Sequence, residues 1–309
     1  MAAEMLRGRD LLSMDDLSRE ELQAVLARAA DLKARLRAGE QPPVAAGKTL
    51  AMIFEKPSLR TRVTFEVGMR QLGGQAVYLA PQDIQLGTRE SVPDVARNLS
   101  RWVEAIMART YAHRTVQELA DHASVPVING LSDREHPCQT LGDLLTIQEH
   151  FGRLEGIRLT WVGDGNNVLH SLLLGGAKVG LRITVSTPPA YEPAGEVVAR
   201  ARAIGGEGAV VLMPDPYEAV RGADVIYTDV WVSMGQEAER EQRLRAFAGY
   251  RVDGALLRAA GGPVRVMHCL PAHRGEEITA EVLDGPQAIV LDQAENRLHA
   301  QKGLLAMIL

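Results

Sequence analysis

The chain has 309 residues, which at about 150 residues per domain predicts roughly two domains. Hydrophobic residues make up 46% and charged residues 24%, a composition typical of globular proteins and unlike that of disordered ones. The 34 Lys and Arg against 39 Asp and Glu give a formal net charge of −5, which disfavours a general nucleic-acid-binding role.

Hydropathy and the two cysteines exclude further classes of protein. Apolar runs stay far below the ~20 residues that a membrane helix needs, and the N-terminal segment lacks the apolar core of a secretory signal. Cys138 and Cys269 form no CxxC pair, which excludes a disulfide scaffold or a zinc knuckle. We therefore expect a cytoplasmic protein without a membrane or nucleic-acid partner.

Strand-like and helix-like apolar patterns alternate from the beginning of the chain. A first helix is predicted after the capping-box pair Ser18 and Glu21, with apolar residues at helical period until Gly39. The strands predicted next are 50–54, 76–79, 105–108 and 125–128. The helices predicted between and after them are 60–72, 92–103, 116–122 and 137–151.

The same alternation resumes in the second half of the chain. Strands are predicted at 159–162, 182–185, 209–212, 225–228 and 264–268, with helices between them. The pattern predicts an α/β fold with two domains, each a parallel sheet flanked by helices. We expect a first domain at 1–150, a second at 151–293, and a C-terminal helix at 294–309 that packs back on the first domain.

Polar residues that follow the predicted strands are candidates for ligand binding, because parallel sheets bind ligands beyond the carboxyl ends of their strands. In the first such segment, Ser58 and Thr61 bring hydroxyls, and Arg60 and Arg62 bring guanidiniums, to the start of a helix. That combination suits a phosphate. Residues two apart do not share a helix face, so we favour Arg60 as the ligand and Arg62 as structural. A capped helix with solvated charges explains the spacing equally well.

A second candidate pair opens the helix at 137–151. His136 and Gln139 lie three residues apart, hence on one face, and as two donors they are suited to polarising a carbonyl oxygen. Taken alone, the spacing favours the simpler interpretation, in which His136 caps the helix and Gln139 lies on the surface.

Three weaker segments follow strands of the second half. Gly163 to Asn167 begins like a dinucleotide-binding fingerprint but lacks the third glycine, so an Asn that binds a polar ligand is at least as plausible. Asp229 and the Ser-Met-Gly loop after it are suited to an ammonium group, or form a plain loop in which Ser233 caps a helix. Cys269 is either an activated nucleophile or an inert buried thiol.

Together and in this order, the segments resemble the aspartate/ornithine carbamoyltransferase family, and specifically its members that act on ornithine. The resemblance covers nearly the whole chain. It rests on the motifs Phe54-Glu55-Lys56-Pro57-Ser58, His136-Pro137-Cys138-Gln139, Ser233-Met234-Gly235, His268-Cys269-Leu270-Pro271 and Glu295-Asn296-Arg297. One departure is Leu59, where the family often has Thr.

The resemblance implies transfer of the carbamoyl group of carbamoyl phosphate to the δ-amino group of L-ornithine, giving L-citrulline and phosphate. It assigns carbamoyl phosphate binding to Ser58, Leu59 (through its backbone), Arg60, Thr61, Gln85, Arg109, His136, Gln139 and Arg297. It assigns ornithine binding to Asn167, Asp229, Ser233, Met234, Cys269 and Leu270. Arg109, His136 and Cys269 are the implied catalytic residues.

Further expectations follow from the same resemblance. No metal or organic cofactor is needed, because the carbamoyl group arrives activated as a mixed anhydride. A homotrimer or a multiple of trimers is expected, with Gln85 lent to a neighbouring subunit's site. The Leu270–Pro271 bond is expected to be cis. Clustered arginines are costly without an anion, so carbamoyl phosphate should bind first and order its site.

Two questions stay open at this point. The proton of the attacking amine goes either to Cys269 with Asp229 or to the leaving phosphate. The amine is alternatively acetylornithine or putrescine, whereas aspartate is disfavoured because Asp229 would repel its extra carboxylate. An alternative hypothesis from another functional class is a non-catalytic anion-binding module. It predicts that the protein binds phosphate esters without releasing phosphate.

Overall fold

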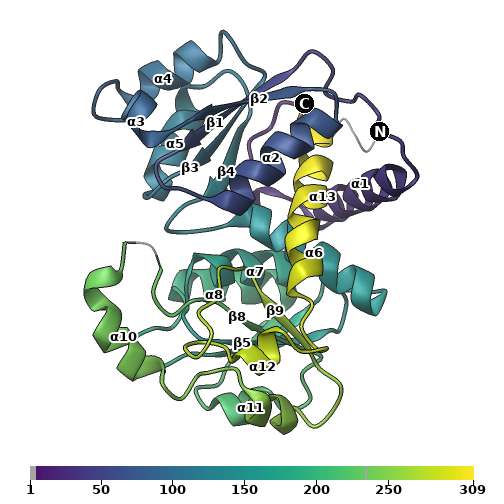
Figure 1. Cartoon of the computed structure of the whole chain (residues 1–309), viewed down its shortest axis with the longest axis vertical. Coiled ribbons are helices and arrows are strands. Elements are labelled where there is room, and N and C mark those ends of the chain that lie inside the picture. Colours follow the sequence, from purple (N-terminus) through teal and green to yellow (C-terminus); the bar gives the residue numbers. More distant parts are fainter. Residues whose placement is uncertain (1–4, 234) are drawn as a thin grey trace. The chain divides into compact units, whose positions relative to one another are not determined.

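The computed structural model describes residues 5–233 and 235–309, and the chain divides into two compact units. The first unit comprises the described residues up to Leu145 together with Glu295–Leu309, and the second comprises Thr146–Ala294. Each unit is built around its own parallel sheet (Figure 1). This is the predicted fold class.

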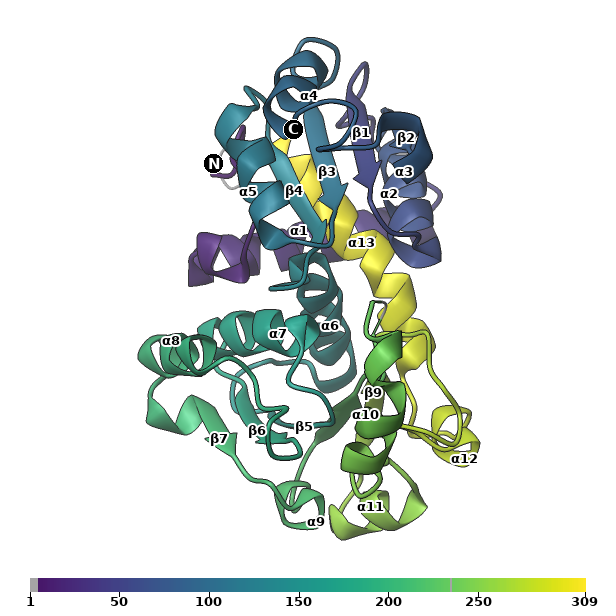
Figure 2. The same ribbon diagram turned by 90° about the vertical axis from the view of Figure 1, so that its left-hand side faces the viewer.

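The first unit contains a four-stranded parallel sheet in the order β2-β1-β3-β4. Its strands are β1 (Thr49–Phe54), β2 (Gln75–Leu79), β3 (Ala105–Arg109) and β4 (Val127–Leu131). Its helices are α1 (Arg19–Arg37), α2 (Leu59–Gln71), α3 (Pro81–Ile84), α4 (Val92–Leu99), α5 (His113–His122) and the start of α6 (Pro137–Phe151). Helices α4 and α5 cover one face of this sheet (Figure 2). Their apolar side chains pack on those of β1 and β3.

The second unit contains a five-stranded parallel sheet in the order β7-β6-β5-β8-β9. Its strands are β5 (Arg158–Val162), β6 (Arg182–Ser186), β7 (Val210–Leu212), β8 (Val225–Thr228) and β9 (Arg265–His268). Its helices are α7 (Asn167–Lys178), α8 (Gly195–Gly205), α9 (Pro216–Ala219), α10 (Arg240–Phe247), α11 (Gly254–Ala259) and α12 (Ala280–Leu283).

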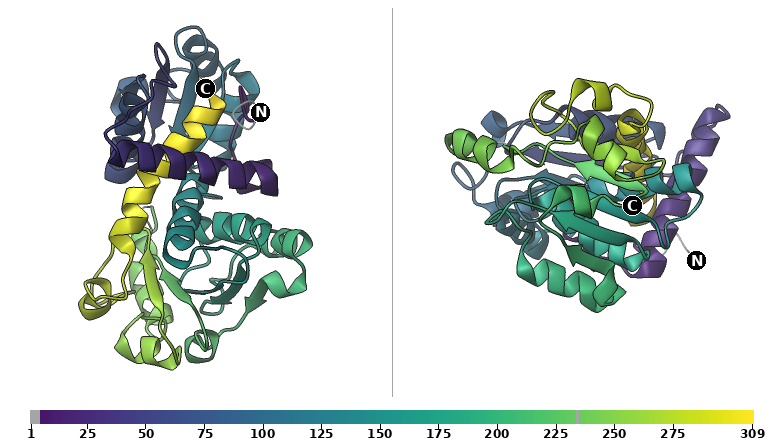
Figure 3. Two further views of the ribbon diagram at one scale, coloured as in Figure 1. Left: turned by 90° about the vertical axis from the view of Figure 1, so that its right-hand side faces the viewer. Right: turned by 90° about the horizontal axis from the view of Figure 1, so that it is seen from below.

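The C-terminal helix α13 (Val290–Ile308) packs on the first unit, as predicted, although it begins four residues before the expected start at 294. It crosses α1 closely at Gly303, which leaves room for Ala29 (Figure 3). It also contacts α2, where Lys302 Nζ donates to Gln71 Oε1 at 2.9 Å. These contacts place Arg297 in the interior of the first unit, where it is 2% exposed.

Local sequence signals explain where most elements begin and end. Ser18 and Glu21 form the predicted reciprocal capping box at the start of α1. The helix predicted to run to residue 103 ends at Leu99, and the Ser100 N–H and hydroxyl both donate to the Ala96 carbonyl. The strand predicted at 125–128 instead spans Val127–Leu131, since Pro126 has no N–H to contribute to the ladder.

Two further findings concern whole-chain properties. Among the described residues, none of the helices combines the length and the apolar character required to cross a membrane. Both cysteines are free thiols, with Cys138 buried and Cys269 half-buried. Burial raises the pKa of Cys138 to about 12, so this thiol is an inert part of the core.

Candidate functional site

The first turn of α2 offers groups that are suited to an anion. Ser58 caps the helix, and its Oγ accepts the Thr61 N–H at 3.3 Å. The N–H groups of the first turn have no partner within the helix, and the helix dipole adds a partial positive charge there. The Leu59 side chain is 74% exposed, so only its backbone N–H is suited to a ligand.

Arg60 and Arg62 have different surroundings. The Arg62 guanidinium lies 3.8 Å above the Tyr78 ring, with Glu66 3.7 Å away, on an exposed face of α2. Arg60 is half-buried, and its charge contributes to lowering the pKa of His136. The two arginines therefore lie in different environments, Arg62 on an exposed face and Arg60 near the buried His136.

Arg109 ends β3 and is 6% exposed. The pairing of β3 with β4 shifts register between Ala108 and Arg109. Such a bulge commonly redirects a side chain next to a binding site. Arg109 is also among the charges that act on His136, so the two groups lie in one cluster.

His136 precedes α6 and starts this helix with its backbone, because its carbonyl accepts the Gln139 N–H at 3.0 Å. Its imidazole is buried among cations instead of capping the helix. Burial lowers the pKa of His136 well below its usual value, and the charges of Arg297, Arg109, Lys56 and Arg60 lower it further. The ring is therefore neutral near pH 7 and carries one N–H, suited to donation toward a carbonyl oxygen.

Gln139 lies in the core of the unit rather than on its surface. It is 1% exposed, and its Oε1 accepts from Arg297 Nη1 at 2.6 Å. Its amide donates to Asp143 Oδ1 at 2.8 Å. Arg297 also reaches the buried Thr61, whose Oγ1 accepts from Nη2 at 3.3 Å, so the Thr61 hydroxyl keeps its proton for a further acceptor.

Lys56 belongs to the same cluster, although the sequence analysis did not select it. It is 8% exposed and lies 4.9 Å from the centre of the Tyr111 ring. Burial lowers the pKa of Lys56 to about 8, and Arg109 adds to this effect. Its position directly before Pro57, at the end of a buried strand, was the signal available in the sequence. The first unit thus gathers Lys56, three arginines and a neutral imidazole.

Gln85 stands apart from this cluster in its surroundings. It is exposed at the C-terminal end of α3, in the left-handed region with φ of 44°, and its N–H donates to the Pro81 carbonyl. An exposed amide in a fixed backbone conformation is suited to contact with another molecule.

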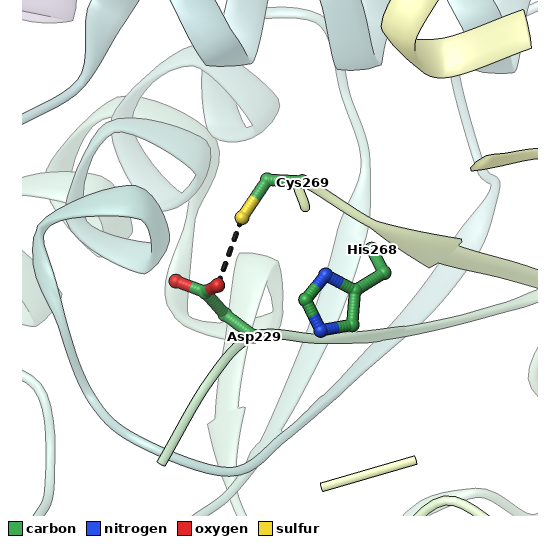
Figure 4. Close-up of side chains that lie close together, drawn as sticks. All are labelled: Asp229, His268 and Cys269. Carbon is green, nitrogen blue, oxygen red and sulfur yellow. Dashed lines mark hydrogen bonds between the residues drawn. The ribbon is translucent and has the colours of Figure 1, made fainter. Parts of the chain in front are cut away.

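In the second unit, Asp229 follows β8 and is 6% exposed. Its Oδ2 accepts from Asn166 Nδ2 at 2.7 Å, and its Oδ1 accepts from the Val230 N–H at 2.8 Å. Cys269 follows β9, and its thiol donates to Asp229 Oδ1 at 2.9 Å (Figure 4). Asn166, which donates to Asp229, was not predicted from the sequence, because its partner lies 63 residues away at the end of another strand.

The three side chains drawn in Figure 4 offer potential metal ligands within 4.8 Å of one another. Both ring nitrogens of His268 are occupied, however. Nε2 lies 3.0 Å from Glu277 Oε1, and Nδ1 lies 2.9 Å from the Leu270 nitrogen. Metal binding through His268 would break one of these hydrogen bonds, so the donor set does not fit a resident metal.

The remaining predicted residues of the second unit lie near the same strand ends. Asn167 is the first residue of α7 and is half-buried. Ser233 is half-buried, and it caps no helix; its N–H donates to Gln236 Oε1 at 3.0 Å. Leu270 adopts φ of 57°, and its bond to Pro271 is cis, as expected. Met234 lies outside the described residues.

The loop after Asp229 is anchored at its base. Arg243 of α10 is 4% exposed, and its Nε donates to the Trp231 carbonyl at 2.5 Å. Its guanidinium also pairs with Asp164 Oδ2 at 2.5 Å. The segment that begins like a dinucleotide fingerprint is thereby tied to this loop.

Gly165 argues against dinucleotide binding at that segment. A Cβ atom there would lie 2.3 Å from the Pro193 nitrogen and 2.6 Å from the Tyr191 carbonyl oxygen. The glycine is needed because another backbone segment packs on it.

Comparisons with known proteins agree along the whole chain. Residues 9–149 match the carbamoyl-phosphate-binding domain, and residues 155–308 the Asp/Orn-binding domain, of the aspartate/ornithine carbamoyltransferases. The chain is 55% identical to the ornithine carbamoyltransferase of Symbiobacterium thermophilum, covering 98% of this chain and 99% of the relative. It is 56% identical to that of Methanoculleus marisnigri, covering 97% of both.

Solved structures show the same relationship. The ornithine carbamoyltransferase of Pyrococcus furiosus superimposes with a TM-score of 0.95 at 52% identity, covering 98% of this chain and 97% of the other. The ornithine carbamoyltransferase of Thermus thermophilus superimposes with a TM-score of 0.87 at 49% identity, covering 96% of this chain and 97% of the other.

Proposed function

The chain belongs to the aspartate/ornithine carbamoyltransferase family, and from this premise we propose that it carbamoylates L-ornithine. The enzyme transfers the carbamoyl group of carbamoyl phosphate to the δ-amino group, giving L-citrulline and phosphate. The observation that carries this assignment is the pairing of two sites in one chain. A buried cationic cluster in the first unit suits the phosphoanhydride, and a buried carboxylate with a thiol in the second suits an amino acid.

In the first unit, carbamoyl phosphate binds among the clustered cations. The helix-start N–H groups of Ser58, Leu59 and Arg60 and the Thr61 hydroxyl bind the phosphoryl oxygens. The Arg60 guanidinium adds charge-assisted hydrogen bonds. Support comes from the capped first turn of α2 and from the cations that lower the pKa of the buried His136.

The carbonyl oxygen of the substrate is bound by Arg109 and His136. In the reaction the δ-nitrogen attacks the carbamoyl carbon, the bond from this carbon to the phosphate oxygen breaks, and the electron pair leaves with phosphate. Negative charge develops on the carbonyl oxygen in between, where a guanidinium and a neutral imidazole N–H stabilise it. Gln139 completes the carbonyl site, and its Oε1 also accepts from Arg297 Nη1, which helps to hold that guanidinium in place.

In the second unit, Asp229 binds the α-ammonium group of ornithine. The α-amino and carboxylate groups are also bound by Asn167, Ser233 and Met234. A carboxylate has about four lone-pair positions, so Asp229 keeps capacity beyond its three present donors. Attack requires the neutral δ-amine, whose ordinary pKa resembles that of lysine. The Cys269–Asp229 pair is one acceptor for this proton, and the leaving phosphate is the other.

We also propose a trimeric assembly, or a multiple of trimers, in which Gln85 completes the site of a neighbouring subunit. The exposure of Gln85 supports this role. Light scattering tests the assembly, and a monomer would contradict it. A cytoplasmic location fits the two free thiols, and fractionation of cells tests it.

The decisive experiment compares amines under identical conditions. Purified protein is given carbamoyl phosphate with ornithine, acetylornithine, putrescine or aspartate, and both carbamoylated amine and inorganic phosphate are measured. We expect ornithine to give the highest kcat/KM and one phosphate per citrulline. Negligible citrulline, or a preference for another amine, would contradict the assignment. A non-catalytic anion-binding protein would release no phosphate above the uncatalysed background.

A further inference from the structure

A buried carboxylate behind the Cys269–Leu270 segment has no part in the reaction described above. Glu277 lies in the loop after β9 and is 0% exposed. Its Oε1 accepts from two directions, from His268 Nε2 at 3.0 Å and from the His273 N–H at 2.6 Å. One carboxylate oxygen therefore joins the two ends of the segment that carries Cys269 and Leu270.

The hydrogen bonds of His268 determine which of its nitrogens carries the proton. The Leu270 backbone N–H can only donate, so His268 Nδ1, 2.9 Å away, must be the acceptor. The proton of the neutral ring then lies on Nε2 and is donated to Glu277. Burial would raise the pKa of Glu277, but hydrogen bonds from His268 and His273 bring it below its usual value, so the carboxylate is ionised and accepts this proton.

The acceptor at His268 Nδ1 stabilises an unusual backbone conformation at Leu270. Leu270 has φ of 57°, in the left-handed region that leucine rarely adopts. A tautomer with the proton on Nδ1 would face the Leu270 N–H with a second donor and repel it. The conformation of Leu270, and with it the direction of its carbonyl and of the Cys269 thiol, thus depends on the tautomer.

We propose that Glu277 is a positioning residue for carbamoyl transfer, which fixes the Nε2–H tautomer of His268 and thereby holds the Cys269–Leu270 segment for the attacking amine. The inference rests on the proposed function, because that function places Cys269 and Leu270 beside ornithine. Glu277 itself touches no substrate; it acts through His268. The same arrangement, a carboxylate that orients a histidine whose other nitrogen does the work, recurs in catalytic sites.

Two pairs of variants separate this role from general support of the fold. Glu277→Gln keeps the size of the side chain, but its amide can also donate to Nε2 and so admits the wrong tautomer. We expect it to lower kcat/KM for ornithine at least tenfold and to change the dissociation constant for carbamoyl phosphate less than twofold. Arg274→Ala, in the same loop but exposed and paired with Asp284, serves as the control with unchanged kinetics.

The second pair tests His268 itself. In His268→Asn the amide oxygen takes the position of Nδ1 and can accept the Leu270 N–H, whereas in His268→Gln the amide reaches toward Glu277 and leaves that N–H unpaired. We expect the Asn variant to retain at least fivefold more kcat/KM for ornithine than the Gln variant. Equal or reversed activities would overturn the proposal.

A spectroscopic measurement reads the tautomer directly. Protein labelled with ring-15N histidine is recorded by long-range 15N–1H correlation, with the His268 signal assigned by its loss in His268→Asn. We expect the Nε2–H pattern in the wild type and averaged nitrogen shifts in Glu277→Gln. An Nδ1–H pattern in the wild type, or unchanged activity of Glu277→Gln, would refute the inference alone. Absence of citrulline formation by the wild type would instead refute the proposed function.

Discussion

Arg60 and Arg62 lie two residues apart at the start of one helix, and their surroundings differ enough for a matched test. Arg60→Ala should weaken the binding of carbamoyl phosphate by about 2–5 kcal/mol, because charge-assisted contacts to a desolvated anion are lost. Arg62→Ala should change it little, since this guanidinium stacks on Tyr78. Isothermal titration measures both constants. Equal effects of the two changes would remove the distinction drawn between these side chains.

Lys56 makes the affinity for carbamoyl phosphate depend on pH. Burial and Arg109 lower its pKa to about 8, so above this pH the free protein carries a neutral amine. A bound phosphate dianion favours the charged form, and binding then takes up a proton. The affinity should fall by up to about tenfold per pH unit as the pH rises above 8.

Titrations of Lys56→Met and Lys56→Arg with a phosphonate analogue of the same charge check this expectation. The Met variant should bind more weakly, with an affinity that no longer falls above pH 8. The Arg variant stays charged and should keep its affinity at high pH. A decline in the Met variant as steep as in the wild type would assign the titration to another group.

The sequence pointed to candidate site residues more readily than to the residues that form hydrogen bonds with them. Asp229 and Cys269 were selected because each follows a predicted strand, and His136 because it directly precedes a helix, whereas Arg109 was implied by the family resemblance. Asn166 and Glu277 were not selected, because their partners come from other strand ends or from the far end of a loop. Such pairings depend on the order of strands in the sheet, which apolar periodicity does not reveal.

At the scale of elements, the close crossing of α13 and α1 offers a test of packing. A Cβ at Gly303 would lie 2.8 Å from both the Ala29 nitrogen and the Val25 carbonyl oxygen, which are backbone atoms of α1. Gly303→Ala should therefore lower the free energy of unfolding by about 1–3 kcal/mol. This strain outweighs the gain in helix propensity, at most about 1 kcal/mol.

Gly195→Ala is the matched control, because a Cβ at this helical position meets nothing within 4 Å. It should leave the free energy of unfolding unchanged or raise it by a few tenths of a kcal/mol. Denaturant titration followed by circular dichroism compares the two variants. Similar stabilities would show that α1 and α13 can separate without cost at their crossing.

Element boundaries followed the local chemistry of particular residues. α6 and β8 span the predicted 137–151 and 225–228, since a proline opens the helix and an unbroken apolar run forms the strand. The short helices α9, α11 and α12, of four to six residues, were not located, because so few residues carry no measurable periodicity. Their positions are set by tertiary packing.

At the scale of the whole molecule, two parallel sheets divide the chemistry between them. The first unit gathers cations around the buried His136, and the second pairs the Asp229 carboxylate with the Cys269 thiol; the proposed function assigns carbamoyl phosphate to the former and ornithine to the latter. Strand–helix alternation was enough to predict two parallel α/β sheets. It did not predict strand order or the exact place of Arg297, which depends on how α13 returns to the first unit.

The central claim is that the δ-nitrogen of ornithine receives the carbamoyl carbon. Carbamoyl phosphate labelled with 13C and ornithine labelled with 15N only at the δ-nitrogen are incubated with the protein, and the product is observed by 13C NMR. The account predicts a ureido carbon signal split by a one-bond coupling to 15N, appearing together with inorganic phosphate. A carbamoylated product without that coupling, or no product above the uncatalysed background, would contradict it.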